Sequence, residues 1–339
     1  MKYCRRIGIV TIIFVLLSNI ATAQNNSNYD IINKMLIDGK YKEVVQTCTD
    51  ILKKDSLNPD LHYKLGLAYQ YLLFSEKSLR EYKIASKLLP ENKTYLFSLA
   101  KQYYLSGKMS LAEPIFVQLY KSDSSNWLYG YYLAEFYLQS GSYEKSMSIY
   151  NSVYRYDTRN YIILDKTAYC WIKLENNQRA IDTYKKSLDI NANNIVTIKS
   201  LSLVLKKLKK YDSALIYLNK GIEFDSTDLD LYLRRGDVYY ALNYHKQARE
   251  DYMRILRSGD SSAQVLKKIG LGYQYAEKYK NAEKFLYLSY LKDTTDYELC
   301  RYLGNTYNEL KEYDKSVMFY EKSIQLLSPT LLNISRSYF

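Results

Sequence analysis

The side chains best suited to catalysis or metal binding are few in this 339-residue chain, and they lie far apart. There are two histidines, His62 and His245, and the sequence has no HExxH, GxSxG, P-loop or GxGxxG pattern. After the first few residues three cysteines remain, Cys48, Cys170 and Cys300, too widely spaced for a metal motif and odd in number for a disulfide framework. The acidic residues form no recurring pair. The sequence therefore predicts no enzyme, no catalytic residue, no metal site and no cofactor.

The remaining chemistry is that of binding, and tyrosine dominates it. The chain has 40 tyrosines, each offering a large apolar area with a polar tip. Such an excess indicates either an interaction surface or aromatic residues that merely fill helix surfaces. Gly (12 residues) and Pro (4 residues) are scarce, which argues against a β-sandwich or barrel, because those folds need many turns.

A repeat of 34 residues organises the chain. In the first half of each copy a small residue recurs between large apolar ones, as in Leu65, Gly66 and Tyr69. This spacing places the large residues on one helical stripe. When the copies are aligned, each position of the repeat forms a column of equivalent residues. A column in which only small residues occur marks a place where another helix comes close. The small column comprises Gly66, Ala100, Ala134, Ala168, Ser202, Gly236, Gly270 and Gly304.

A second helix is predicted in the other half of each copy. Glycines such as Gly39, Gly107 and Gly141 suit the turn before it, and Asn58 and Asn126 suit the N-cap of the next first helix. Its small column is Val44, Ser78, Ala112, Ser146, Ala180, Ala214, Ala248, Ala282 and Ser316. Four residues later comes a bulky column: Cys48, Tyr82, Phe116, Tyr150, Tyr184, Leu218, Tyr252, Leu286 and Tyr320.

This pattern resembles the tetratricopeptide repeat, and segments 143–150 (YEKSMSIY) and 313–324 (YDKSVMFYEKSI) look like its second helix. The resemblance implies an all-α, right-handed superhelical solenoid of nine stacked repeats over residues 24–328. The repeats would start near residues 25, 59, 93, 127, 161, 195, 229, 263 and 297. The proline that usually closes a family repeat survives only as Pro90. After Pro329, residues 329–339 are expected to begin a terminal or truncated helix. Its apolar character suggests a missing continuation, a docking partner or self-association.

In this family the first helix of each repeat lines a concave groove, and the resemblance implies the same here. The candidate groove residues lie beside the core stripe: Tyr63, Phe97, Lys101, Tyr104, Tyr131, Glu135, Tyr169, Lys199, Tyr240, Lys267, Arg301 and Asn305. Aromatic residues dominate the early repeats, and basic or amide residues the later ones. Rings give contact area at low entropic cost and cations hold acidic groups, so the predicted partner is a protein or peptide, and an acidic one suits the cations.

The N-terminus predicts secretion. A positively charged segment at residues 2–6 precedes an apolar stretch at residues 7–17, and residues 21–23 (ATA) form a small-x-small cleavage site. Removal of this signal peptide, residues 1–23, would lower the formal net charge from +12 to +9 and leave no transmembrane span. An uncleaved membrane anchor is the alternative. A bacterial periplasmic or outer-membrane-associated protein is expected, and such a protein rarely meets nucleic acid, so no nucleic-acid partner is predicted.

The sequence thus predicts a non-catalytic scaffold of the cell envelope that binds a polypeptide in the concave groove. Two other functions fit the same residues. One is the N-terminal sensory or regulatory ectodomain of a longer signalling protein, whose membrane span and output domain would lie beyond Phe339. The other is a chaperone for envelope assembly or secretion.

Overall fold

The computed structural model describes residues 29–337, with the backbone alone from residue 328 onward. The predicted signal peptide, residues 1–23, lies outside the described residues. Within them every regular element is a helix, so the predicted all-α class is confirmed. The chain divides into two compact units, Met1–Thr158 and Arg159–Phe339, each of which is a stack of helices.

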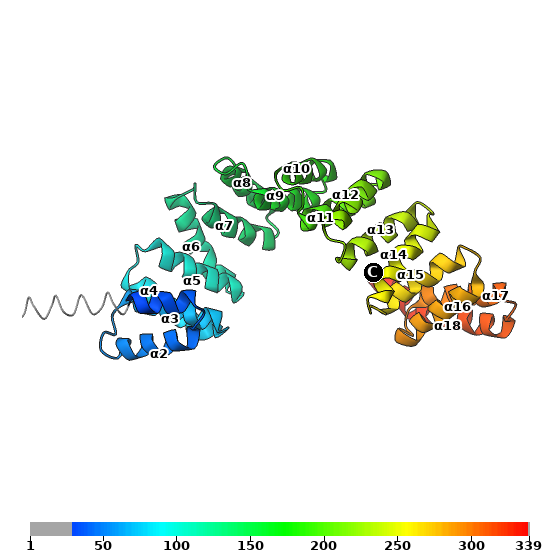
Figure 1. Cartoon of the computed structure of the whole chain (residues 1–339), viewed down its shortest axis with the longest axis horizontal. Coiled ribbons are helices and arrows are strands. Elements are labelled where there is room, and N and C mark those ends of the chain that lie inside the picture. The colour runs from blue at the N-terminus through cyan, green and yellow to red at the C-terminus, as the bar shows by residue number, and fades with distance from the viewer. Residues whose placement is uncertain (1–28, 338–339) are drawn as a thin grey trace, which may run out of the picture. The chain divides into compact units, whose positions relative to one another are not determined.

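Within each unit a first helix and a second helix, joined by a short turn, form an antiparallel pair (Figure 1). First helices carry odd numbers from α3 onward, and second helices carry even numbers. The first unit contains a helix over residues 29–37, α2 (Tyr41–Leu52), α3 (Pro59–Tyr71), α4 (Ser75–Leu88), α5 (Lys93–Leu105), α6 (Met109–Ser122), α7 (Trp127–Gln139) and α8 (Tyr143–Tyr154). The second contains α9 (Tyr161–Lys173), α10 (Asn177–Ile190), α11 (Ile195–Lys207), α12 (Tyr211–Phe224), α13 (Leu229–Ala241), α14 (His245–Arg257), α15 (Ala263–Gln274), α16 (Tyr279–Lys292), α17 (Tyr297–Glu309) and α18 (Tyr313–Ser337).

The two helices of a pair meet where the small column of the first faces the bulky column of the second. A Cβ atom added to Gly66 would lie 2.7 Å from a ring carbon of Tyr82, and one added to Gly236 would lie 2.6 Å from a ring carbon of Tyr252. Both tyrosines are almost completely buried. Since interiors are close-packed, this approach leaves room for only a small residue, which explains the small column.

Serines in the second-helix small column tie the pairs together with hydrogen bonds. Ser78 donates from Oγ to the carbonyl of Gly66 at 2.8 Å, and Ser316 donates in the same way to Gly304 at 2.9 Å. All four residues are buried. A buried hydroxyl must find a partner, and here it bonds to the residue that permits the close approach.

Most first helices begin with a side-chain cap, although α15 begins after Ser262 without one. Asn92, for example, accepts hydrogen bonds from the backbone N–H groups of Thr94 at 3.0 Å and Tyr95 at 3.2 Å. Such caps satisfy donors that the first turn leaves free. They occur at Asn58, Asn92, Asn126, Asn160, Asn194, Asp228 and Asp296. The second helices α4, α6, α8, α12, α14 and α16 begin without one.

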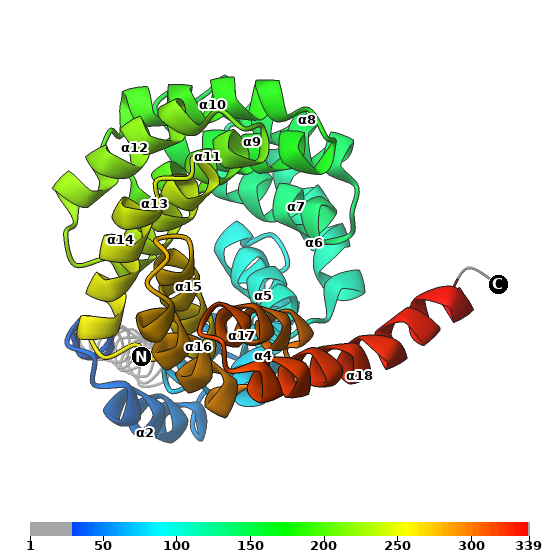
Figure 2. The same ribbon diagram turned by 90° about the vertical axis from the view of Figure 1, so that its right-hand side faces the viewer.

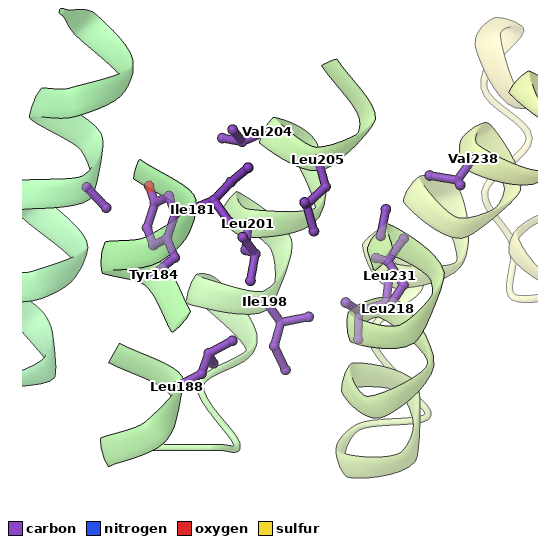
Figure 3. Packing of buried hydrophobic residues seen from close by; sticks show 12 residues of the cluster. Ile181, Tyr184, Leu188, Ile198, Leu201, Val204, Leu205, Leu218, Leu231 and Val238 are labelled. Atoms are coloured by element: carbon purple, nitrogen blue, oxygen red, sulfur yellow. The ribbon is translucent and has the colours of Figure 1, made fainter. Parts of the chain in front are cut away.

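Each pair buries its apolar stripe by stacking on the next pair. Figure 3 shows this in the second unit, where Leu201 of α11, Leu218 of α12 and Leu231 of α13 meet. All three side chains are fully buried. Burial of apolar area is the main stabilising term, at roughly 25 cal/mol per Å². Because one pair cannot enclose its own stripe, the fold requires neighbours on both sides.

The last helix differs from the sequence-based expectation. The sequence predicts a break at Pro329 and a new helix after it, whereas α18 continues through Pro329 to Ser337 and is longer than α17 (Figure 2). Proline fixes a helical φ and removes only one backbone donor, so the helix continues on both sides of it at the loss of that hydrogen bond. Pro114 lies inside α6 in the same way.

Candidate protein-binding face

All twelve predicted binding residues lie on first helices, on a side that we call the first-helix face. Side chains three, four and seven residues apart share one side of a helix. Val196 and Leu203 therefore lie on this face with Lys199, and they are 69% and 56% exposed. The predicted residues are Tyr63 on α3; Phe97, Lys101 and Tyr104 on α5; Tyr131 and Glu135 on α7; Tyr169 on α9; Lys199 on α11; Tyr240 on α13; Lys267 on α15; Arg301 and Asn305 on α17.

In the first unit the structure brings four of these residues together around Tyr132. The ring centroids of Phe97, Tyr104 and Tyr131 lie 5.4, 5.7 and 5.4 Å from that of Tyr132. These separations are favourable for aromatic pairs. The Lys101 ammonium lies 5.9 Å from the same ring, a cation–π contact. Burial in this cluster raises the pKa of Tyr104 to about 12, so its hydroxyl stays protonated at neutral pH.

The other two predicted residues of the first unit are engaged with neighbouring helices. The ring of Tyr63 stacks on that of Tyr95, with centroids 4.9 Å apart. Glu135 is only 8% exposed, and its carboxylate accepts a hydrogen bond from the hydroxyl of Tyr150. Both therefore hold helices together as well as lying on the first-helix face.

In the second unit the predicted cation Lys199 is fixed by acids of the next first helix. Its ammonium lies 2.6 Å from a carboxylate oxygen of Asp228 and 3.1 Å from one of Asp230. Arg234 also binds Asp230, at 3.0 Å. Burial alone would lower the pKa of Lys199, but the hydrogen bonds to both aspartates outweigh it and leave that pKa raised. Lys199 is therefore a charged, positioned group.

Lys267, two repeats later, repeats this arrangement. Its ammonium lies 2.7 Å from Asp296 and 3.2 Å from Glu298. In both cases the acids follow the lysine by 29 and 31 residues, and the first acid is also the N-cap of the next first helix. Burial again acts to lower the lysine pKa, and the hydrogen bonds to the acids raise it overall.

A third bridge centres on Asp237 of α13. Its carboxylate lies 3.1 Å from the ammonium of Lys206 on α11, and it also binds Lys268 on α15. The hydroxyl of Tyr252 donates to it at 2.8 Å. Burial would raise the pKa of Asp237, but the two lysines outweigh burial and lower it. One carboxylate thus joins three successive first helices.

The sequence analysis did not single out the acidic partners of Lys199 and Lys267. The signal that could have found them is the spacing from Lys199 to Asp228 and Asp230, repeated from Lys267 to Asp296 and Glu298. A search for acidic residues 29 and 31 positions after each predicted lysine would have found both pairs of acids.

Tyr169 and Tyr240 differ in how open they are. Tyr169 is 40% exposed, with the ammonium of Lys173 at 5.3 Å from its ring. Tyr240 is half-buried, and its ring lies 5.6 Å from that of Tyr275 and 5.3 Å from His245. Tyr169 is therefore the more accessible aromatic contact of the two.

The two predicted residues on α17 also have partners within their own repeat. The guanidinium of Arg301 lies 4.7 Å from the ring of Tyr302. Asn305 accepts a hydrogen bond at 2.7 Å from the hydroxyl of Tyr320 on α18. The structure thus fixes the orientation of Asn305, while Arg301 is exposed.

Of the groups considered first for catalysis, His62 and the three cysteines have structural surroundings. His62 bonds through Nδ1 to Glu81 at 2.7 Å and through Nε2 to the carbonyl of Ser56 at 3.1 Å. Cys48, Cys170 and Cys300 are buried and are not joined in a disulfide. Over residues 29–327, whose side chains are placed, no three His, Cys, Asp or Glu side chains gather as metal ligands would. No described helix combines the length and the apolar composition needed to cross a bilayer.

A family model, the tetratricopeptide repeat, matches residues 200–228, 229–258 and 303–326. The chain thus contains tetratricopeptide repeats. The family predicted from the 34-residue period is therefore confirmed. No curated protein matches the chain.

Three solved structures are similar to this chain at low sequence identity. PilF of Pseudomonas aeruginosa is 17% identical, with 67% of this chain and 99% of that chain covered and a TM-score of 0.51. A tetratricopeptide repeat protein from Parabacteroides merdae is 18% identical, with coverage of 78% and 98% and a TM-score of 0.49. YrrB, described as having an unusual peptide-binding site, is 18% identical, with coverage of 54% and 94% and a TM-score of 0.48.

Tetratricopeptide repeats are in general non-catalytic scaffolds, and the fold supports a role in protein–protein interaction. Within each unit the stacked first helices present side chains from several repeats along one face. This arrangement suits contact with another polypeptide more than it suits chemistry at one point.

Proposed function

We propose that this chain is a non-catalytic scaffold of the cell envelope that holds a polypeptide against its first-helix face. One observation carries the proposal. In the second unit this face sets exposed apolar side chains among charges that are already positioned, as with Val196 and Leu203 beside the bridged Lys199. Binding to fixed charges costs less ordering entropy than binding to mobile ones, and exposed apolar groups supply the contact area.

Site-specific photo-crosslinking tests the proposal. We would replace Tyr169 of α9 with p-benzoylphenylalanine, and as a matched control Tyr287 of the second helix α16, since both side chains are 40% exposed. Irradiation of cells that produce the full chain should give a polypeptide adduct from position 169 and none from position 287. Adducts from position 287 alone, or equal adducts from both, would reject binding at the first-helix face.

The envelope location rests on the residues before the described part. A basic segment, a short apolar stretch and the ATA site at residues 21–23 support export. Sequencing the N-terminus of the chain purified from the envelope fraction should therefore begin at Gln24. A chain that keeps Met1 and fractionates with the cytoplasm would contradict export.

A further inference from the structure

Two cavities on the first-helix face of the second unit occupy equivalent places in successive repeats. The first, of about 180 Å³, lies between α11 and α13, and the second, of about 230 Å³, lies between α13 and α15. Every residue that lines the second follows a residue that lines the first by one repeat of 34 residues. The equivalent pairs are Lys206 and Tyr240, Leu218 and Tyr252, Asp230 and Gln264, Leu233 and Lys267, Arg234 and Lys268, and Asp237 and Leu271.

Each cavity is large enough for one bulky apolar side chain. A protein cavity of about 150 Å³ lined by apolar residues can hold benzene. The first cavity is lined with Leu203, Leu218 and Leu233, and the second with Tyr240 and Leu271. These walls would cover a leucine or an aromatic ring and remove its apolar surface from water.

The rims of the two cavities carry different charges. The first rim has both signs, as in the paired Arg234 and Asp230. Among the described residues that line the second there are two lysines, Lys267 and Lys268, and no acid. Each ammonium has three donors, so Lys268, which is bonded to Asp237, keeps donors for a further acceptor. Lys267 is also paired, with Asp296 and Glu298, so what each lysine offers is a remaining ammonium donor. The second rim therefore suits an acceptor group of a ligand, such as a carboxylate.

We take the spacing of the cavities to be the usual spacing of neighbouring packed helices. The first helices α11 and α13 are in direct contact, and packed helices lie about 8–10 Å apart. A polyproline II segment has three residues per turn and a rise of about 3.1 Å, so side chains three residues apart lie on one side at about 9 Å. Side chains two or four residues apart would not point to the same side.

From this match we infer that the two cavities take two bulky apolar side chains, three residues apart, of an extended polypeptide with an acidic residue beside the second. The inference rests on the proposed function and names the kind of segment that the first-helix face selects. Asp237 is shared: it lines the first cavity and binds Lys268 and Tyr252 of the second. Its ion pairs keep the two cavities in register.

Binding of synthetic peptides to the full chain tests the spacing. Three labelled peptides would have the same composition, with two leucines two, three or four residues apart and a glutamate beside the second leucine. Fluorescence anisotropy should give the tightest binding for the spacing of three, by about tenfold, since a lost leucine anchor costs about that factor. Equal affinities, or no binding of the spacing-of-three peptide up to about 1 mM, would overturn the inference.

Matched variants test whether the peptide binds in these two cavities. Leu203→Asp at the first cavity should weaken the spacing-of-three peptide about tenfold, whereas Ile216→Asp on α12, outside both cavities and equally exposed at 56%, should not. Gln264→Glu at the second rim should weaken binding and Gln264→Lys should strengthen it, with little effect on a peptide whose glutamate is replaced by glutamine. Circular dichroism and thermal melting would confirm that each variant folds.

The outcomes separate this inference from the proposed function. If position 169 crosslinks a polypeptide but Leu203→Asp leaves peptide binding unchanged, the cavity assignment fails and binding at the face stands. If neither the crosslink nor the peptide preference appears, both fail. Equal weakening by Leu203→Asp and Ile216→Asp would also reject the cavities, because it would show a general effect of added charge.

Discussion

Arg235 places a half-buried charge at a repeat position that is otherwise mostly apolar. Its Nε and Nη2 atoms donate to the two carboxylate oxygens of Asp251, at 2.9 and 2.7 Å. Asp251 is only 5% exposed. Burial raises the pKa of Asp251 even though Arg235 acts to lower it. The pair is thus a specific two-point contact whose carboxylate depends on its partner.

Removing Arg235 should destabilise the fold in a pH-dependent way. Arg235→Ala leaves Asp251 buried without that partner, and breaking a buried pair costs about 3–5 kcal/mol. Because the folded state raises the pKa of Asp251, protonation relieves the cost, which is smallest at low pH and grows as pH rises through the folded pKa. Urea unfolding at pH 5 and pH 8 should show a larger deficit from the parent chain at pH 8.

Arg257→Ala, at an exposed position on α14, provides the comparison and should change the unfolding free energy by less than about 0.5 kcal/mol. A deficit for Arg235→Ala that is the same at both pH values would show that its loss acts through packing and not through the Asp251 charge.

At the scale of helices, the two helix types are set up by different local signals. Most first helices start at a side-chain cap, whereas most second helices follow a turn residue in the left-handed region, such as Leu73 (φ 62°), Gly107 (φ 70°) or Gly141 (φ 77°). Ser142 precedes α8, where a serine cap would be expected, but its side chain makes no cap hydrogen bond. The residue type alone therefore does not reveal which caps act.

Replacing an N-cap residue by alanine should destabilise the protein only where its side chain makes a cap hydrogen bond. Asn92→Ala removes the acceptor for the N–H groups of Thr94 and Tyr95 and should lower the free energy of unfolding by about 1 kcal/mol. Ser142→Ala should change it by less than about 0.5 kcal/mol, although serine is an equally good capping residue by type. Equal losses in urea unfolding would mean that the cap hydrogen bond is not what stabilises α5.

The helices could be predicted from sequence because their signals are local and repeated. The small column and the period follow from a contact that each repeat makes in the same way, as between Gly66 and Tyr82. The candidate binding residues could be placed on first helices for the same reason. Their partners could not, since the cluster around Tyr132 and the acids around Lys199 depend on side-chain directions between repeats. The passage of α18 through Pro329 was missed because proline disfavours a helix without forbidding it.

For the whole molecule, contacts run mainly between neighbouring helices. In the first unit α7 packs on α6 and α8, and in the second α15 packs on α14 and α16. A stack held by nearest-neighbour contacts has a stability close to a sum of repeat and interface terms. Weakening one interface between helices should therefore destabilise mainly the helices beside it, whereas a globular core unfolds as one unit.

Gly130→Ala tests this locality. The added Cβ would overlap Cγ2 of the buried Val153 and lie 3.1 Å from Tyr120, and such overpacking costs about 1–3 kcal/mol. Amide hydrogen exchange followed by mass spectrometry should become about tenfold faster or more in α7 and α8, while α15 to α17 keep the exchange rates of the parent chain. Adding Val153→Ala should restore part of the protection by removing the overlapped methyl groups. Equal acceleration in α15 to α17 would instead show that the stack opens as one cooperative unit, in which case interface terms far exceed the stability of single repeats.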